Sequence, residues 1–456
     1  TEDSFEEIHP ASYRRKKRKG KKEEDLSRFE TVETRTYKLE GKARYCPECG
    51  KKYNVVTKEV VKRLRFVPAK FEVEEEVTYV YSCPCCGTMK RPEKEPSLIR
   101  GSIATPSLVA GIMNAKYVNG MPLARQEREF ARYDLALSTK TMANWIITCA
   151  DRYLKLLYQL MKEELLESRY IHCDETRIQV LGEPEQKGTT QNWMWVYLTD
   201  EFSGSPQMVL FDYERTRAGY HPVRFLENRF HGYLTCDGYQ AYHSLGEEIM
   251  VSGCFTHARR RFDAALTALK KDFTKEQLKE TVAYQAMSRI GILYKIEEMI
   301  PDKTPEEKYE ERQKQSRPIV DALFEWLHTM EDSVDRSSLI GDAILYTLNQ
   351  EVYLRRYLED GHLSIDNNSA ERALKNFAVG RRNWLFAKSI RGADASAIVY
   401  SITETALRNR LKPYVYLTYI LDELRKMGPF PKADELKKLL PWSEDLPDYC
   451  RTKLKK

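Results

Sequence analysis

The sequence contains no run of 18 or more apolar residues and no visible secretory signal. A membrane-spanning helix needs about 20 such residues, so we expect none. The chain also has no large excess of one charge, because 31% of its residues are charged but the net charge is only +6. It has no internal repeat, and it begins at Thr1 rather than Met, so we expect residues upstream to be missing.

One segment near the start is strongly basic. The run from Arg14 to Lys22 holds eight cations in nine positions and is followed at once by three acidic residues. Such a run is either a solvated, disordered tail or an arm that binds phosphates with an affinity that falls with salt. The two interpretations are compatible, and the rest of the chain contains no low-complexity segment.

Ten cysteines could indicate disulfides, but four of them have the spacing of metal ligands. Cys46-Pro-Glu-Cys49 and Cys83-Pro-Cys-Cys86 form two knuckles, each followed by glycine. A CxxC turn places two thiolates on one side, and two such turns supply a tetrahedral site that suits zinc. The other cysteines are scattered singly in apolar contexts, which favours a reducing cytoplasm.

The cysteine segment has alternatives. Cys85 is a spare thiol that could replace Cys83 or Cys86 as a ligand. A thioredoxin-like redox pair also uses CxxC, but no βαβ pattern surrounds either knuckle. A zinc deaminase needs H-x-E followed by P-C-x-x-C; the chain has no H-x-E, and its knuckles have proline after the first cysteine. We therefore predict a structural zinc ion within residues 31–100.

The segment after the cysteines has a helical pattern that fits a DNA-binding hairpin. Leu123 to Tyr133 has the pattern of one helix, a short turn follows, and Ser138 is placed to cap a second helix that runs to Trp145. This order is typical of a helix-turn-helix, and an ordinary helical hairpin packed on the core is the alternative. The side chains expected to face DNA are Lys140, Thr141 and Asn144.

Three acidic residues occupy settings that could bring them together. Asp174 ends the run Tyr-Ile-His-Cys-Asp, Asp237 ends the run Gly-Tyr-Leu-Thr-Cys-Asp, and Glu371 opens a helix-like segment. The expected order is strand 169–181, strand 192–199, strand 207–213, helix 218–229, strand 232–237, helix 239–247 and strand 249–254. A meander of three strands followed by a crossover is the ribonuclease H-like order, in which the first and fourth strands are adjacent and parallel.

Three carboxylates at one place repel one another and raise each other's pKa, so the cluster needs cations. Two magnesium ions roughly 4 Å apart would activate an attacking oxygen and stabilise a leaving one, with manganese as a substitute. The cluster therefore predicts metal-dependent phosphoryl transfer with Asp174, Asp237 and Glu371 as catalytic residues and metal ligands.

Each acid has an ordinary alternative. Asp174 could be a cap or turn residue, and Asp237 could be a turn aspartate. Glu371 lies three residues after an asparagine, which is the capping-box position. Two further acids are nearby, Glu175 and Asp366, and Asp366 could cap the helix or join the metal shell.

Four stretches carry a resemblance to a known family, and the resemblance as a whole covers about residue 40 to about residue 425. They are Asp237–Tyr242, Gly253–Phe262, Leu363–Leu374 and Gly380–Phe386. On these motifs, with a cysteine domain ahead of them, the chain resembles the insertion sequence 66 family of bacterial transposases.

The resemblance implies a D-D-E transposase that cuts one strand at an element's end and joins the freed 3′-hydroxyl to target DNA. It implies DNA ends and target as partners, a homodimer or higher oligomer on DNA, helper proteins, and a cytoplasmic, nucleoid-associated location in bacteria. A metal-dependent nuclease that never joins strands remains the alternative within enzymes. A DNA-binding regulator with an inert core is the alternative from another class.

Basic residues around the acids are expected to contact DNA. His257 follows the last strand beside a basic triplet, although a lone histidine is usually structural. Trp384 could stack on a base, and core packing is its alternative. The expected contacts on the core are His257, Arg259, Arg260, Arg372, Lys375, Arg381, Arg382 and Trp384.

More than 130 residues separate the fourth strand from Glu371, so we expect a helical insertion that splits the ribonuclease H-like core. The expected division is a basic tail at 1–30, a zinc domain at 31–100, a helical segment at 101–165, the first core part at 166–262, the insertion at 263–360, the second core part at 361–426 and a C-terminal tail at 427–456. The insertion has an apolar stripe that must be buried in its own bundle or against a second subunit. The stripe comprises Ile319, Leu323, Phe324, Leu327 and Met330.

Overall fold

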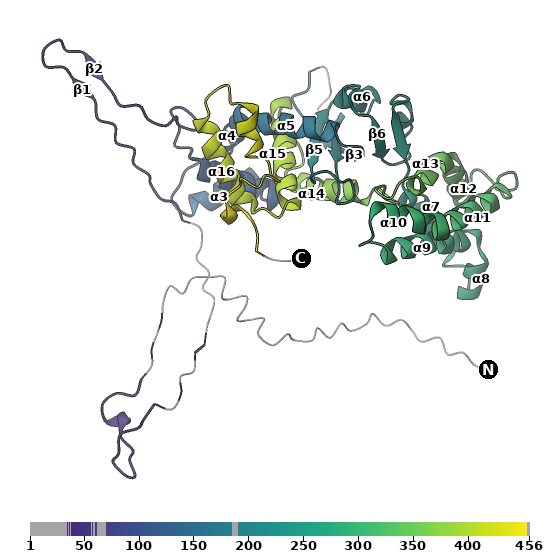
Figure 1. Ribbon diagram of the computed structural model, residues 1–456, viewed down its shortest axis with the longest axis horizontal. Coiled ribbons are helices and arrows are strands. Elements are labelled where there is room, and N and C mark those ends of the chain that lie inside the picture. Colours follow the sequence, from purple (N-terminus) through teal and green to yellow (C-terminus); the bar gives the residue numbers. More distant parts are fainter. Residues whose placement is uncertain are drawn as a thin grey trace. The chain divides into compact units, whose positions relative to one another are not determined.

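The structure is a computed structural model (Figure 1) that describes residues 34, 36, 38–55, 57, 60–61, 70–184 and 190–453. The chain divides into two units, Thr1–Glu76 and Val77–Lys456. The basic run from Arg14 to Lys22, and with it the expected tail at 1–30, lies outside the described residues.

The cysteine segment contains little regular structure. Among its described residues the first unit contains the 3₁₀ turn η1 (Gly41–Arg44), and the second unit contains a hairpin of two short strands, β1 (Tyr81–Ser82) and β2 (Met89–Lys90). The stretch from Phe71 to Tyr81 is rich in β-branched and aromatic residues, but only its last residue belongs to a strand. β-branched residues favour a strand only where a neighbouring strand pairs with them, and residues 70–80 are not assigned to a strand in the described part of the chain.

A five-stranded mixed sheet forms the centre of the second unit, in the order β5-β4-β3-β6-β7. The first three strands are an antiparallel meander, whereas β6 lies parallel to β3, and β7 parallel to β6. The strands are β3 (Tyr170–Gln179), β4 (Gln191–Leu198), β5 (Val209–Glu214), β6 (Gly232–Thr235) and β7 (Ile249–Ser252). The predicted meander and parallel first and fourth strands are therefore present.

Alternation along the strands gives the sheet two apolar faces, each covered by helices. On one face, Tyr197 stacks on Phe225 of α6 (Tyr220–Leu226) with ring centres 3.7 Å apart. On the other, Phe211 packs against Phe377 of α14 (Asn368–Trp384) and Tyr400 of α15 (Ile390–Arg408). The expected helix 239–247 is only a 3₁₀ turn, η4 (Gln240–Ser244).

The helices before the sheet share one core with it and with the C-terminal helices. The earlier group is α2 (Pro106–Met113), α3 (Leu123–Ala131), α4 (Thr139–Cys149) and α5 (Lys155–Leu166), with π-helical turns η2 (Asn114–Val118) and η3 (Ala150–Leu154). The later group is α16 (Pro413–Lys426), α17 (Ala433–Lys437) and the 3₁₀ turn η7 (Asp448–Cys450). Figure 1 shows these helices gathered at one end of the sheet.

A second core belongs to the helices between β7 and α14, at the other end of the sheet (Figure 1). They are α7 (Phe255–Leu269), α8 (Lys275–Glu280), α9 (Val282–Met299), α10 (Pro305–Glu311), α11 (Arg317–His328), α12 (Leu339–Asn349) and α13 (Glu351–Arg355), with η5 (Arg312–Ser316) and η6 (Arg356–Leu358). The apolar stripe of α11 faces this core: Leu323, Phe324 and Leu327 are fully buried, and Ile319 and Met330 pack against them. The stripe is therefore buried within its own helical bundle and not against a second subunit.

A charged residue fixes this second core. Arg312 is buried, yet its guanidinium donates to both carboxylate oxygens of Glu297 and to the carbonyls of Tyr357, Asp360 and Leu363. A buried charge is tolerated when it is paired and its donors are satisfied, so Arg312 joins three segments of the bundle.

Among the helices that the structure describes, none is long and apolar enough to cross a membrane.

The outer edge of β5 is satisfied by side chains rather than by another strand. Ser401 and Thr405 of α15 accept hydrogen bonds from the backbone N–H groups of Phe211 (2.8 Å) and Val209 (3.0 Å). An unpaired strand edge would otherwise be open to association with other chains.

Replacing Ser401 with Ala should lower the free energy of unfolding by about 1–3 kcal/mol, because it leaves the buried N–H of Phe211 without an acceptor. Urea denaturation measures the change. Ser333→Ala at an exposed position is the matched control and should stay within about 0.5 kcal/mol of the parent chain. A Ser401→Ala protein as stable as the control would contradict this account.

Candidate functional site

Two of the three predicted acids meet where β6 ends. The parallel register pairs His172 of β3 with Thr235 of β6. Asp174 and Asp237 each follow this pair by two residues, so they lie side by side across the two strands. Asp174 is still inside β3, whereas Asp237 lies just beyond the end of β6. Asp174 lies inside a strand and is not a cap or turn residue, whereas Asp237 does form a turn, accepting from the backbone N–H of Tyr239 at 2.9 Å.

A third carboxylate completes this group. Oxygens of Asp174, Glu175 and Asp237 all lie within 4.8 Å of one another, which fits a divalent cation bound by hard oxygen ligands. Glu175 is buried, and it also receives hydrogen bonds from Tyr242 and from Arg217. Arg217 thus places a positive charge beside the carboxylates, with its Nη2 3.8 Å from Asp237 Oδ2.

The electrostatics follow from burial and crowding. Burial raises the pKa of Asp174 well above its ordinary value, and the negative charges of Glu175, Asp237 and Glu371 raise it further. Burial and Asp237 also raise the pKa of Glu175, although Tyr242 and Arg217 partly oppose this. The site therefore disfavours its own negative charge, and a bound cation would relieve that cost.

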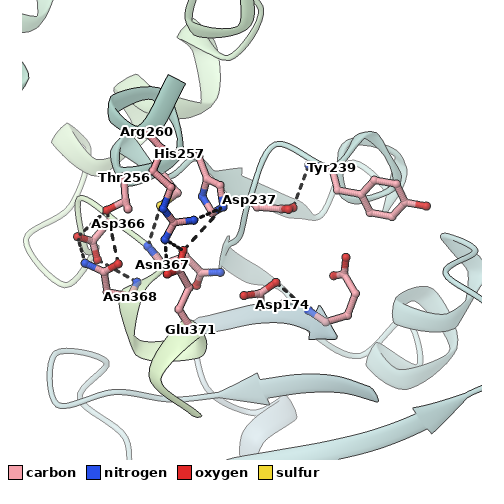
Figure 2. Close-up of polar contacts among 12 residues, drawn as sticks. Asp174, Asp237, Tyr239, Thr256, His257, Arg260, Asp366, Asn367, Asn368 and Glu371 are labelled. Carbon is pink, nitrogen blue, oxygen red and sulfur yellow. Dashed lines mark hydrogen bonds and ion pairs between the residues drawn. The ribbon is translucent and has the colours of Figure 1, made fainter. Parts of the chain in front are cut away.

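Glu371 approaches from a different helix and is held by a cation. It lies in the first turn of α14, and its carboxylate accepts two hydrogen bonds from Nη2 of Arg260 on α7 (Figure 2). Nε2 of His257, one turn earlier on α7, lies 3.7 Å from the same carboxylate. Glu371 forms no capping box, because α14 has no side-chain cap and its N-cap residue is Asn367. The capping interpretation of Glu371 is therefore wrong.

Asp366 has a different role from the other acids. It accepts from the backbone N–H of Asn368 at 3.0 Å and from the side-chain amide of the same residue at 2.6 Å (Figure 2). Both bonds hold Asp366 against the first residue of α14, and a place for Asp366 in a metal shell stays a prediction.

Asn367 fastens α14 to β3. Its amide donates to the carbonyl of Cys173 at 2.8 Å, and its Oδ1 lies 3.0 Å from Nδ1 of His172. Nε2 of His172 faces Asp200 at 3.0 Å. Burial works to lower the pKa of His172, but the Asp200 carboxylate outweighs burial, so that pKa is raised. This buried chain of contacts fixes Glu371 relative to Asp174.

The other residues expected to contact DNA on the core do not gather around the acids. Arg259 lies over the ring of Tyr294 on α9, so within the basic triplet only Arg260 reaches Glu371. Arg372 donates to Ser369 of its own helix, and Lys375 is exposed. Trp384 is half-buried and packs edge-on to Tyr117, while Arg381 and Arg382 lie at the far end of α14.

The helical hairpin forms with the expected cap. Ser138 accepts from the N–H of Thr141 at 3.1 Å, and Glu127 of α3 accepts from the N–H of Thr139, which fixes the two helices together. Lys140 and Asn144 are exposed, and Thr141 is half-buried. All three lie on the outward side of α4, whose buried residues pack into the core.

The two cysteine knuckles have the same local geometry, one in each unit. Gly50 donates to the carbonyl of Cys46 and Gly87 to that of Cys83, both at 2.9 Å. Both glycines have positive φ, 69° and 71°, which a side chain would oppose. Hydrogen bonds from Cys49 and Glu48 lower the pKa of Cys46 to about 7, and those from Thr88 lower the pKa of Cys86 to about 7. Each knuckle therefore favours thiolates, the form that binds metal.

Sequence reasoning missed the roles of four residues at the site. Arg217 lies in a loop and carries no motif of its own, and the link between His172 and Asn367 joins residues 195 positions apart. Tyr242 had a signal, because it closes the stretch that begins at Asp237.

Comparisons with known proteins agree on a family. A family model described as "Transposase IS66 family" matches residues 101–395, and one described as "zinc-finger binding domain of transposase IS66" matches residues 43–87, which span both knuckles. Two uncharacterised proteins of Sinorhizobium fredii are similar over most of their length. The protein named y4hP is 30% identical over 87% of this chain and 73% of its own, and y4qI is 31% identical over 84% and 70%.

Magnesium should stabilise the protein more at pH 8 than at pH 5.5. The pKa of Asp174 is raised in the folded protein. Without metal, the folded protein therefore loses stability as pH rises through this pKa, because the buried carboxyl must then ionise. Metal requires the ionised form, so its contribution grows with pH, to about 1.4 kcal/mol at ten times the dissociation constant. Thermal melting at both pH values measures this.

The Asp174→Asn variant is the control for this titration. It should melt at a higher temperature than the parent chain without metal, because a buried charge has been removed, and it should lose most of the magnesium response. An equal magnesium response in parent and variant would show that the cation binds elsewhere.

Proposed function

The chain belongs to the IS66 family of transposases, and from this premise we propose that it cuts the ends of its element and joins the freed 3′-hydroxyl to target DNA. The single observation that carries the proposal is the meeting of Asp174 and Asp237 at the end of β6, with Glu371 directed at the same place from α14. The order β5-β4-β3-β6-β7, with β3 and β6 parallel, supports a ribonuclease H-like core.

Asp174 and Asp237 would hold one magnesium ion between them, and Glu371 would help hold a second after leaving Arg260. Bound magnesium would activate the attacking oxygen and stabilise the leaving oxygen of the phosphodiester. Glu175 would keep Arg217 beside the carboxylates. Arg260, once released by Glu371, has the planar fork that suits a phosphate.

DNA would be held by the exposed cations and amides of two regions. The outward side of α4 supplies Lys140, Thr141 and Asn144, which would read or fix the element's end. On the core, Arg372, Lys375, Arg381 and Arg382 would contact backbone phosphates.

Replacing Asp237 with Ala should reduce nicking of a supercoiled plasmid that bears both ends of the encoding element by at least about 100-fold, because a direct metal ligand costs more than a supporting residue. Binding to the same DNA should change by less than about twofold. Asp263→Ala, an exposed aspartate on α7, is the matched control and should cut normally.

A strand-transfer assay with labelled element ends separates the alternatives. The proposal expects both nicked and joined products in magnesium. A nuclease without strand transfer gives nicked product alone, and a DNA-binding regulator gives neither product. Asp237→Ala protein that nicks at the parent rate would refute the assignment of the site.

We also propose that Cys46, Cys49, Cys83 and Cys86 bind one structural zinc ion, as the zinc-finger match and the matching knuckles suggest. The tight turn of each knuckle brings its first and fourth residues together, whereas Cys85 lies between the ligands of the second knuckle.

Elemental analysis of the purified chain should find about one zinc per molecule. Cys46→Ser should lose the metal and expose residues 31–100 to proteolysis, because zinc binding supplies the folding free energy of such domains. Cys85→Ser is the matched control and should keep the zinc. Retention of zinc by Cys46→Ser together with its loss from Cys85→Ser would reverse the ligand assignment.

Joining two ends to a target needs an active site at each end, so we propose a dimer or higher oligomer on DNA, aided by helper proteins. The stripe on α11 is buried within its own bundle and cannot provide that contact without unfolding.

A further inference from the structure

The backbone turns sharply at Leu385, where α14 ends. Leu385 has φ 63° and ψ −47°, and the N–H of Phe386 donates to the carbonyl of Trp384 at 2.7 Å. These are the features of a γ-turn with a left-handed central residue, which is rare and strained. Glycine adopts such a conformation readily, whereas a leucine there must be held by its surroundings.

Two backbone hydrogen bonds hold the turn. Ala387 donates to the carbonyl of Gln179 at the end of β3 (2.9 Å) and accepts from the N–H of Leu181 (3.0 Å). The turn is thus fastened to the strand that carries Asp174. The strained backbone does not serve to bury the side chain of Leu385, which is 65% exposed.

The surroundings of Leu385 are basic. Leu385 and Arg381 line a shallow surface pocket together with Arg177 of β3, and Arg382 is adjacent. Burial and the positive charges of Arg382 and Arg177 lower the pKa of Arg381. Within the described ranges, the partners found for Arg381 and Arg177 are a carbonyl, a hydroxyl and an aromatic ring and not a carboxylate.

The aromatic residue next to Leu385 is already engaged. Trp384 packs edge-on to Tyr117, and Lys116 Nζ lies 5.3 Å from the centre of its ring. The exposed apolar group at this turn is therefore the leucine and not the tryptophan.

We propose that Leu385 is a wedge that inserts between stacked bases of DNA while Arg177, Arg381 and Arg382 bind the flanking phosphates. Arg381 donates to the Arg177 carbonyl and the Thr176 hydroxyl, and the Arg177 guanidinium lies over the Trp193 ring, so both are held at the turn by neutral groups. An apolar side chain presented on a strained, anchored turn among such arginines matches the combination that proteins use to unstack a base step and hold the kinked DNA. This inference rests on the proposed DNA binding and adds a residue and a DNA distortion to it.

The position of the wedge relative to the acids is set by β3. Five residues separate Asp174 from Gln179, which is roughly 17 Å at about 3.4 Å per residue.

Fluorescence anisotropy with two 30-base-pair duplexes, one fully paired and one carrying a central A·A mismatch, tests the proposal. A mispaired step costs less to unstack, so the parent chain should bind the mismatched duplex about tenfold more tightly. Leu385→Ala should lose this preference and Leu385→Met should keep it. Arg381→Gln should weaken binding of both duplexes equally and lower the salt slope by about 1.

Two further variants complete the design. Leu385→Gly should lose the preference although it melts at a higher temperature, because glycine accepts the turn without strain. Leu339→Ala, at a 54% exposed leucine on α12, should leave both properties unchanged.

A parent chain that binds both duplexes equally, or a Leu385→Ala protein that keeps the preference, would overturn the wedge while leaving salt-dependent DNA binding intact. A parent chain that binds neither duplex would overturn the proposed DNA binding and the wedge with it.

Discussion

The parallel pairing of β3 with β6 is the constraint on which the site depends. Because β6 stops at Thr235 while β3 continues to Gln179, the chain after β6 is free to turn at Asp237 beside the middle of its neighbour. An antiparallel pairing or a longer β6 would carry Asp237 away from Asp174. The crossover through α6 makes parallel pairing possible, and the packing of Tyr197 on Phe225 holds that helix against the sheet.

The third acid depends on a different physical device. A helix that follows about 100 residues of separately packed helices could dock in several ways, and apolar contacts alone specify its rotation poorly. Asn367 specifies it by polar contacts, since it bonds both to a backbone carbonyl of β3 and to His172. In a buried setting a mismatched polar group is costly, so this pairing selects one position of α14.

The sequence was sufficient wherever a local pattern carries the structure. Ser138 caps its helix as predicted, the mixed α/β class is confirmed, and the strand order expected for the sheet is the observed one. Local spacing was a poor guide where a distant residue competes: Glu371 has the spacing of a capping box, the ordinary alternative considered for it, but binds Arg260 from another helix. The assignment of Asp174, Asp237 and Glu371 to catalysis stays a prediction, as do the ribonuclease H-like identity and the domain boundaries.

The two arginines that bind carboxylates of the site, Arg217 and Arg260, differ in how much it costs to separate them from their partners. Arg217 binds Glu175, which is fully enclosed, and its guanidinium also lies over the ring of Tyr239 at 3.8 Å, so removing it would leave a buried carboxylate unpaired. Arg260 binds Glu371 at a more open place, where its side chain is 55% exposed and water can replace its contacts. The cost of separating an ion pair falls with exposure. Arg217 is therefore a fixed part of the electrostatics of the site, whereas the ion pair of Arg260 with Glu371 costs less to separate.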